Sequence, residues 1–247
     1  MRKVIVTLAL SLVAGALVAH PVRATEALNV LEATLADAGK TPEVSTSYVR
    51  KAATSRNALL LDTRTRLEFD AGHIPGALNI ETLTADRVRE LAGGDMQKEI
   101  ILYCNGPFCQ ASRRAADNLS AAGFTNVRRY QLGIPVWRAL GGPVAVTAGG
   151  VRRITGRDLT AVIIELRPKP EFEKGSLAGA VNAPADLVIR GAQKLPLPED
   201  DFNTRVLLVA GSSQQARSVS NMLGSRPWHN VSYFDGDINS LLVKASR

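Results

Sequence analysis

The sequence predicts an α/β protein with two tandem domains, each a parallel sheet covered by helices on both faces. Residues 60–79 (LLDTRTRLEFDAGHIPGALN) match residues 163–182 (IIELRPKPEFEKGSLAGAVN) without a gap. Further along, residues 101–119 resemble 206–223, and the pair at 126–127 recurs at 230–231. Three matches in one order indicate a duplicated globular unit of about 100 residues. Each copy alternates short apolar runs with helical patterns, which is typical of a parallel sheet.

Two strands in each copy are predicted from apolar runs of four or five residues, and a third strand is predicted after the helix of each copy. Runs without polar alternation suit strands that helices bury on both faces. The predicted strands are 59–62, 99–103 and 127–130 in the first copy, and 162–165, 205–209 and 231–234 in the second.

A helix is predicted from Gln110 to Ala122 in the first copy. Ala115, Leu119 and Ala122 share one face of it, and Gly123 is expected to end it.

The first 24 residues have the plan of a secretory signal peptide. Arg2 and Lys3 precede an uncharged, mostly apolar run over 4–18, which is short for a membrane span, and Val22-Arg23-Ala24 offers a cleavage site after Ala24. We therefore expect a mature chain that begins near Thr25 and is periplasmic or secreted. An uncleaved anchor is the alternative.

The mature chain is expected to have three parts. Residues 25–43 form an N-terminal extension with one helix over 28–38. The first domain covers 44–147 and the second covers 151–247. The boundary is placed at Thr147-Ala148-Gly149-Gly150, where two glycines are expected to break any helix or strand.

Composition excludes several classes of protein. With 45% hydrophobic and 21% charged residues, the chain is not disordered. Two cysteines and three histidines exclude a disulfide-rich scaffold and a four-cysteine zinc site, so we expect no metal and no cofactor. Loss of residues 1–24 removes three basic residues and no acid, which lowers the net charge from +7 to +4. The scattered Lys and Arg residues argue against nucleic acid as a partner, and no membrane association is expected after cleavage.

Cys104 is the candidate nucleophile. It follows a predicted strand and precedes a helix, at the sheet edge where ligands of parallel sheets bind. Backbone N–H groups of the loop and the helix N-terminus would favour a thiolate there. Gly106 permits an unusual backbone angle and Pro107 stiffens the loop. The alternatives are a buried structural thiol for Cys104 and a bystander role for Cys109.

These residues resemble the rhodanese family of sulfurtransferases. Residues 69–80 (FDAGHIPGALNI) resemble its signature F-x-x-x-H-I-P-G-A, and residues 61–64 (LDTR) resemble its strand that ends in D-x-R. Tyr103-Cys104 opens what resembles the family's active-site loop, and residues 123–127, Trp137 and 142–144 resemble its C-terminal landmarks. The resemblance is strong over about 44–146 and weaker over about 152–245, which looks like a degenerate second domain.

The resemblance implies an exported sulfurtransferase in which Cys104 takes a sulfane sulfur from a small anionic donor such as thiosulfate. The resulting persulfide would pass its sulfur to a thiol or to cyanide. The residues expected to bind substrate are Asn105, Gly106, Pro107, Phe108, Cys109, Gln110 and Arg113.

Departures from the family pattern restrict this expectation. No arginine lies inside the loop, and Gln110 stands where related phosphatases need an arginine, which disfavours a phosphatase. Ala210 aligns with Cys104, and Ser176 aligns with His73. The second domain is therefore expected to be structural and unable to form a persulfide.

Two other functions stay open. Cys104 and Cys109 could serve a thiol–disulfide or redox-sensing module, or the chain could be a non-catalytic binding protein. A bridge between the two cysteines needs Cα atoms within about 7 Å, and it would distort the N–H cradle and silence transfer.

Supporting roles are expected for six residues. His73 is expected to fix a turn through backbone hydrogen bonds, and Asp62 and Arg64 to form a structural pair. Trp137 and Trp228 are expected to be core anchors. Phe108 is expected either to wall the pocket or to cap the loop against the other domain.

Overall fold

The computed structural model describes residues 41–82, 84–158, 160–197, 199, 201–224 and 228–242. The predicted signal peptide over 1–24, the predicted helix over 28–38 and most of the N-terminal extension lie outside these residues. Within them, no helix is long and apolar enough to cross a membrane.

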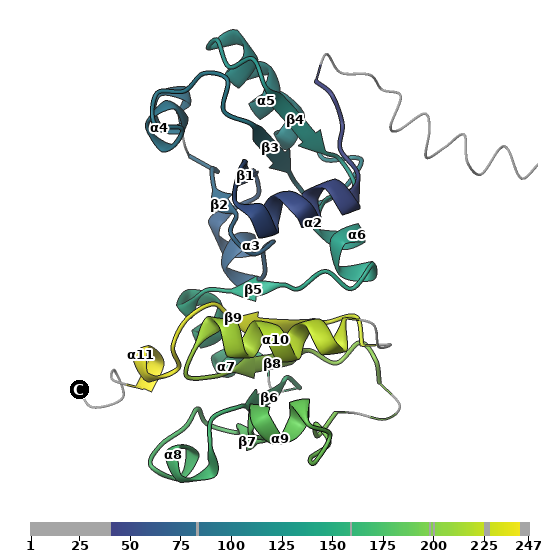
Figure 1. The fold of residues 1–247 in the computed structure, drawn as a ribbon, viewed down its shortest axis with the longest axis vertical. Coiled ribbons are helices and arrows are strands. Elements are labelled where there is room, and N and C mark those ends of the chain that lie inside the picture. The colour runs from purple at the N-terminus through teal and green to yellow at the C-terminus, as the bar shows by residue number, and fades with distance from the viewer. Residues whose placement is uncertain are drawn as a thin grey trace, which may run out of the picture.

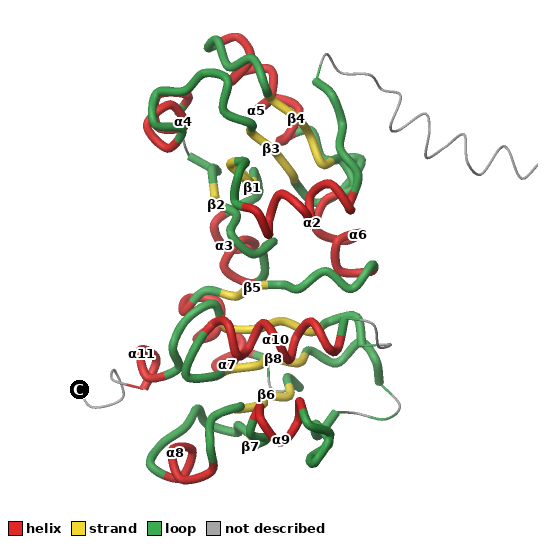
Figure 2. The backbone as a smooth tube through the Cα atoms, in the orientation of Figure 1, coloured by secondary structure: helices red, strands yellow, loops and turns green. Residues whose placement is uncertain are grey.

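The first unit is a four-stranded parallel sheet in the order β2-β1-β3-β4, with helices on both faces (Figures 1 and 2). Its strands are β1 (Leu59–Asp62), β2 (Leu78–Asn79), β3 (Ile100–Tyr103) and β4 (Val127–Tyr130). Its helices are α2 (Thr46–Ser55), α3 (Arg66–Ala71), α4 (Ala85–Leu91), α5 (Ala111–Ala121) and α6 (Gly133–Ala139).

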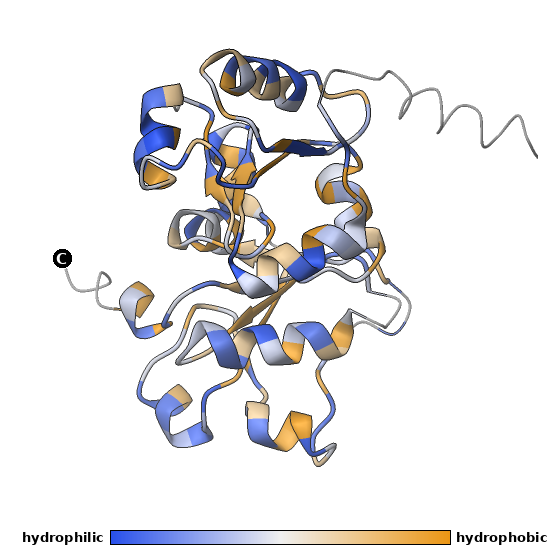
Figure 3. Cartoon of the chain, turned by 45° about the horizontal axis from the view of Figure 1, so that its top comes forward, coloured by the Kyte–Doolittle hydropathy of each residue, from blue (hydrophilic) through white to orange (hydrophobic). Residues whose placement is uncertain are grey.

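The two central strands, β1 and β3, are almost wholly apolar because both of their faces are buried. Successive side chains of a strand point to opposite faces. Leu60 and Tyr103 accordingly belong to the core cluster with Val49 of α2 and Trp137 of α6. Their neighbours, among them Leu102, belong to the cluster on the other face with α4 and α5. Figure 3 shows most strands in hydrophobic colours between helices of mixed character, whereas β4, which contains Arg128 and Arg129, is blue.

The second unit repeats this plan with one more strand. Its sheet is parallel, in the order β5-β9-β8-β6-β7. Its strands are β5 (Ala145–Val146), β6 (Val162–Glu165), β7 (Val181–Asn182), β8 (Val206–Val209) and β9 (Val231–Phe234). Its helices are α7 (Ala148–Arg157), α8 (Lys169–Glu173), α9 (Ala185–Ile189), α10 (Ser213–Leu223) and α11 (Asn239–Leu242). The predicted fold class is therefore confirmed.

The junction between the units differs from the prediction. β5 pairs with β9, so the chain enters the second sheet before residue 147. Thr147 caps α7, and Gly149 and Gly150 lie in its first turn. The interpretation of these glycines as a break was wrong. Gly150 instead permits a close approach, because a Cβ atom there would overlap the carbonyl oxygen of Asp70 in α3.

Backbone and side-chain hydrogen bonds tie the two units together. The N–H of His73 donates to the oxygen of Ala145, and the N–H of Ala145 donates to the oxygen of His73, both at 2.9 Å. Arg138 of α6 donates to the Oδ1 of Asn230 at 3.0 Å. α3 packs against α7 beside these contacts. The second unit thus covers the edge of the first at which the His73 turn lies.

We expect the Gly150→Ala variant to be less stable than the wild type by about 1–3 kcal/mol. The added methyl group has no room beside α3, and the backbone shift that makes room for it costs free energy of this size. The matched control is Gly156→Ala in the same helix, where a Cβ atom would meet nothing within 4 Å. That variant should gain up to about 1 kcal/mol from the better helix propensity of alanine. Urea unfolding measures both. Equal stability of the two variants would contradict the close contact between α3 and α7.

Candidate functional site

The loop over residues 104–110 connects β3 to α5 at the carboxyl end of the sheet. Cys104 directly follows β3 and is 3% exposed. Its carbonyl oxygen accepts the N–H of Ile134 at 3.1 Å. Gly133 has φ +62° and lies so close that a Cβ atom would overlap the same oxygen. The start of α6 therefore fixes the position of Cys104.

The loop folds back on itself through a tight turn. Gly106 has φ +110°, which favours glycine, and its oxygen accepts the N–H of Cys109 at 3.0 Å. Pro107 takes the second position of the turn, which its fixed φ suits. Gln131 donates from Nε2 to the Pro107 oxygen at 3.4 Å. The turn returns the chain to Cys104.

Cys104 and Cys109 are joined by a disulfide in this structure, with their Cα atoms 6.1 Å apart. The sequence left open whether the two Cα atoms come within about 7 Å of each other, and in the structure they do. In this state the Cys109 N–H belongs to the turn, and the Cys104 sulfur has no free valence to accept another sulfur. The structure thus presents the oxidised form of the loop.

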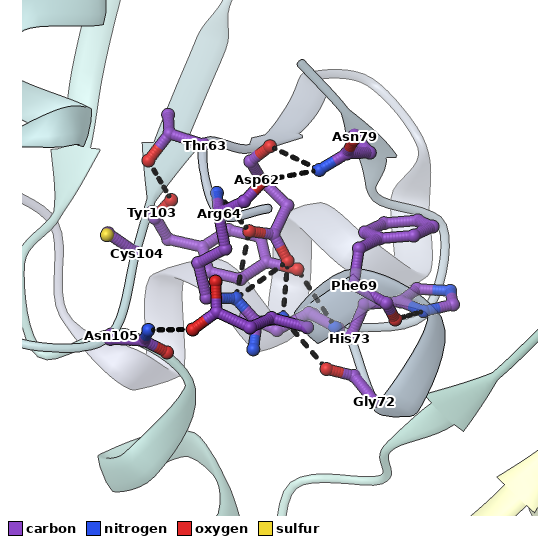
Figure 4. A network of polar contacts seen from close by, with 12 residues as sticks. Asp62, Thr63, Arg64, Phe69, Gly72, His73, Asn79, Tyr103, Cys104 and Asn105 are labelled. Carbon is purple, nitrogen blue, oxygen red and sulfur yellow. Dashed lines mark hydrogen bonds and ion pairs between the residues drawn. The ribbon is translucent and has the colours of Figure 1, made fainter. Parts of the chain in front are cut away.

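Asn105 ties the loop to α3. Its Nδ2 donates to the Oε1 of Glu68 at 2.5 Å (Figure 4). Glu68 also closes a capping box with Thr65 at the start of α3. The hydrogen bond from Thr65, with a smaller contribution from Asn105, lowers the pKa of Glu68 against the effect of desolvation. An ionised carboxylate therefore lies beside the loop.

A buried ion pair lies behind the loop. The Nε and Nη2 of Arg64 donate to the carboxylate of Asp62 at 2.9 and 2.5 Å, and the two side chains are 5% and 0% exposed. Nη2 also donates to the oxygen of Gly72 at 2.8 Å. Asp62 lies opposite Tyr103 in the sheet, and burial raises the pKa of that tyrosine. The predicted structural pair is confirmed, and it supports the strand end that carries Cys104.

His73 has the structural role that the sequence predicts. Its ring stacks on Phe69 with 3.8 Å between centroids, and its Nδ1 lies 2.9 Å from the Phe69 oxygen. Desolvation lowers its pKa, although that hydrogen bond and the carboxylates of Asp235 and Asp62 oppose the shift. A neutral ring that is 4% exposed fixes the turn between α3 and β2.

The second unit repeats the ion pair. Arg167 pairs with Glu165 and donates from Nη2 to the Gly175 oxygen at 2.7 Å. At the position of His73, the Ser176 hydroxyl donates to Glu165. These residues hold the same strand end as their counterparts in the first unit.

The second unit lacks the cysteine loop. The Ala210 oxygen accepts the N–H of Ile238 at 2.9 Å, just as the Cys104 oxygen accepts that of Ile134. However, three residues separate β8 from α10, whereas seven separate β3 from α5. Because the ion pair is present in both units and the loop in one, the pair serves the fold and the loop is the feature free for chemistry.

The remaining predicted residues lie in the loop or in the first turn of α5. Gln110 is exposed and precedes the first turn of α5, while Arg113 is half-buried. Phe108 is 82% exposed, so it does not cap the loop against the second unit. The predicted roles of these residues in substrate binding stay predictions.

The two tryptophans differ in burial. Trp137 is 2% exposed and donates to the Pro143 oxygen at 2.8 Å, as expected of a core anchor. Trp228 is half-buried against the core of the second unit.

A hollow of about 360 Å³ lies between α4 and α5. Thr63, Thr84, Arg114 and Asn118 contribute polar groups to it. Thr63 also donates to the Tyr103 oxygen at 3.0 Å, so the hollow begins beside the residue that precedes Cys104. Within the described ranges, no group of three or more His, Cys, Asp or Glu residues could hold a metal ion.

Sequence reasoning missed three residues that contact the loop. The position of Glu68 at the start of a helix could have been predicted, because the pattern T-x-x-E over 65–68 is typical of a capping box. Gln131 follows β4 at the same sheet edge as Cys104, which is a weaker signal. No local signal indicates Gly133, whose close approach depends on how α6 packs.

A family model for the rhodanese-like domain matches residues 45–140 and, a second time, residues 150–243. Among curated proteins, the HTH-type transcriptional regulator Rv0324 of Mycobacterium tuberculosis is 41% identical over 86 residues. The match covers 34% of this chain and 36% of the regulator, so the chain spans about a third of that relative's length.

The solved structures that match this chain include two enzymes. The thiosulfate sulfurtransferase of Pseudomonas aeruginosa matches with 22% identity and a TM-score of 0.35, over 79% of this chain and 41% of that chain. The 3-mercaptopyruvate sulfotransferase SseA of Escherichia coli matches with 20% identity and a TM-score of 0.37, over 79% of this chain and 98% of that chain.

Proposed function

Because the chain belongs to the rhodanese-like domain family, with two such domains in tandem, we propose that it is a sulfurtransferase that carries a sulfane sulfur on Cys104. One observation carries this proposal. Of two equivalent strand ends, the first bears a cysteine in a folded loop, and the second bears Ala210 before a short connection. The second domain then serves as structural support.

The proposed reaction begins when the Cys104–Cys109 disulfide is reduced. The Cys104 thiolate attacks the outer sulfur of a small anionic donor such as thiosulfate. The sulfur–sulfur bond of the donor breaks, sulfite leaves with the electron pair, and Cys104 holds a persulfide. The N-terminus of α5 favours the anions that develop here. A thiol or cyanide then removes the outer sulfur and restores the thiolate.

The test is a single turnover with reduced protein from which the reductant has been removed. Thiosulfate should release about one sulfite per chain. Peptide mapping of the Cys109→Ser variant, which keeps Cys104 and has no neighbouring thiol to displace the sulfur, should find the transferred sulfur on Cys104. Persulfides on other residues, or no sulfite at all, would refute the proposal.

A second function is favoured by the disulfide itself. Two cysteines joined in one surface loop suit a thiol–disulfide module. In that case the cysteines would cycle between dithiol and disulfide in a redox buffer, and thiosulfate would leave the mass of the reduced chain unchanged.

We also propose that the protein is exported. The cationic start, the apolar run over 4–18 and the site after Ala24 support this location. A disulfide also persists most readily in an oxidising compartment. The N-terminal residue of the protein isolated from its natural host should be Thr25.

A further inference from the structure

We propose that Cys109 is the resolving thiol of the reaction. On this proposal, Cys109 displaces the sulfur carried by Cys104 as hydrosulfide, and a dithiol then reduces the disulfide that remains. The inference rests on the proposed function, because it needs a persulfide on Cys104. Cys109 would then be a second catalytic residue, sulfide a product and a dithiol the final acceptor.

The geometry that carries this proposal is the disulfide and the turn that produces it. The Cys109 sulfur is bonded to the Sγ of Cys104, which would be the inner sulfur of a persulfide. The turn from Gly106 to Cys109 lies wholly within the loop and brings the two Cα atoms to 6.1 Å. A disulfide requires Cα atoms within about 7 Å. Cys109 therefore reaches the atom that it would have to attack.

The step balances in atoms and electrons. The Cys109 sulfur attacks the Sγ of Cys104, and the bond between Sγ and the outer sulfur breaks. The outer sulfur leaves with the electron pair and takes the Cys109 proton, so hydrosulfide is released. The outer sulfur is reduced to sulfide, and the two cysteines are oxidised to the disulfide.

The difference in burial between the two cysteines gives the return step a direction. Cys104 is 3% exposed, whereas Cys109 is half-buried. An incoming dithiol therefore meets Cys109 first, forms a mixed disulfide with it and releases Cys104 as the thiolate. The second thiol of the reductant then frees Cys109. Over one cycle, thiosulfate and a dithiol become sulfite, sulfide and the disulfide of that dithiol.

The experiment follows one turnover of reduced, reductant-free protein with thiosulfate, and it measures sulfite, sulfide and the intact mass of the chain. The wild type should release about one sulfite and one sulfide per chain and end two hydrogen masses below the reduced chain. Cys109→Ala and Cys109→Ser should release the sulfite, hold one extra sulfur on Cys104 and release at least tenfold less sulfide. Addition of a dithiol should start a second turnover in the wild type.

Three other results would contradict the resolving role of Cys109. A wild type that releases sulfite but keeps its persulfide overturns the resolving role and leaves the proposed sulfurtransferase standing. The resolving role is also overturned if the Cys109 variants release sulfide as fast as the wild type. If neither the wild type nor the variants release sulfite, the proposed function itself has failed, and the resolving role fails with it.

Discussion

The Cys104→Ser variant is expected to lose sulfur transfer from thiosulfate to cyanide by at least about 10⁴-fold, a range seen when an enzyme loses its covalent nucleophile. Serine can neither ionise readily near neutral pH nor form a persulfide. The rate of thiocyanate formation measures the loss. The fold should persist, because the substitution exchanges sulfur for oxygen at a strand end that the hydrogen bond from the Ile134 N–H of α6 holds in place.

The control separates the nucleophile from the disulfide, since Cys104→Ser removes both. Cys109→Ser also removes the disulfide but keeps Cys104. It should retain transfer to cyanide, because an external acceptor does not need the resolving thiol. Both variants should show the urea unfolding midpoint of the reduced wild type. An active Cys104→Ser variant would show that Cys104 is not the sulfur carrier. An equal loss in Cys109→Ser would show that transfer to cyanide needs both cysteines.

Much of the sheet could be predicted from the sequence because both of its faces are buried. Most of these strands are short apolar runs, and the structure places β1, β6 and β9 over the predicted residues. β4 also covers its predicted residues, although two of its four residues are arginines. β5 escaped notice because it has two residues and pairs with a strand far along the chain. A pairing of this kind depends on tertiary packing, which no local pattern shows. Gly149 and Gly150 were interpreted as a break for a related reason, because the contact with α3 that Gly150 permits is also a matter of tertiary packing.

The candidate site was predictable in its local part. The position of Cys104 after a buried strand indicated the loop, and the duplication showed that the second copy lacks the cysteine. The disulfide was left open because a separation of five residues does not define the distance between Cα atoms. That distance depends on the turn at Gly106 and Pro107. The contact between Asn105 and Glu68 joins residues 37 positions apart, which no local pattern indicates.

The ion pair of Asp62 and Arg64 leads to the second large effect. We expect Arg64→Met to destabilise the protein by about 3–5 kcal/mol, because removal of one partner leaves a buried charge without compensation. Asp62 is 0% exposed, so water cannot replace the guanidinium. The oxygen of Gly72 also loses its donor. Urea unfolding of the first domain measures the loss.

Three comparisons test the cause. The double variant Asp62→Asn/Arg64→Met should be more stable than Arg64→Met alone, since the isolated charge is gone. Arg87→Met breaks the pair with Glu90, whose side chains are 55% and 64% exposed, and should cost no more than about 1 kcal/mol. Arg167→Met should destabilise the second domain as Arg64→Met does the first, because the same pair is buried there without a cysteine loop. If Arg64→Met removed sulfur transfer while the first domain kept its stability, the pair would act in the chemistry and the repeat in the second domain would need another explanation.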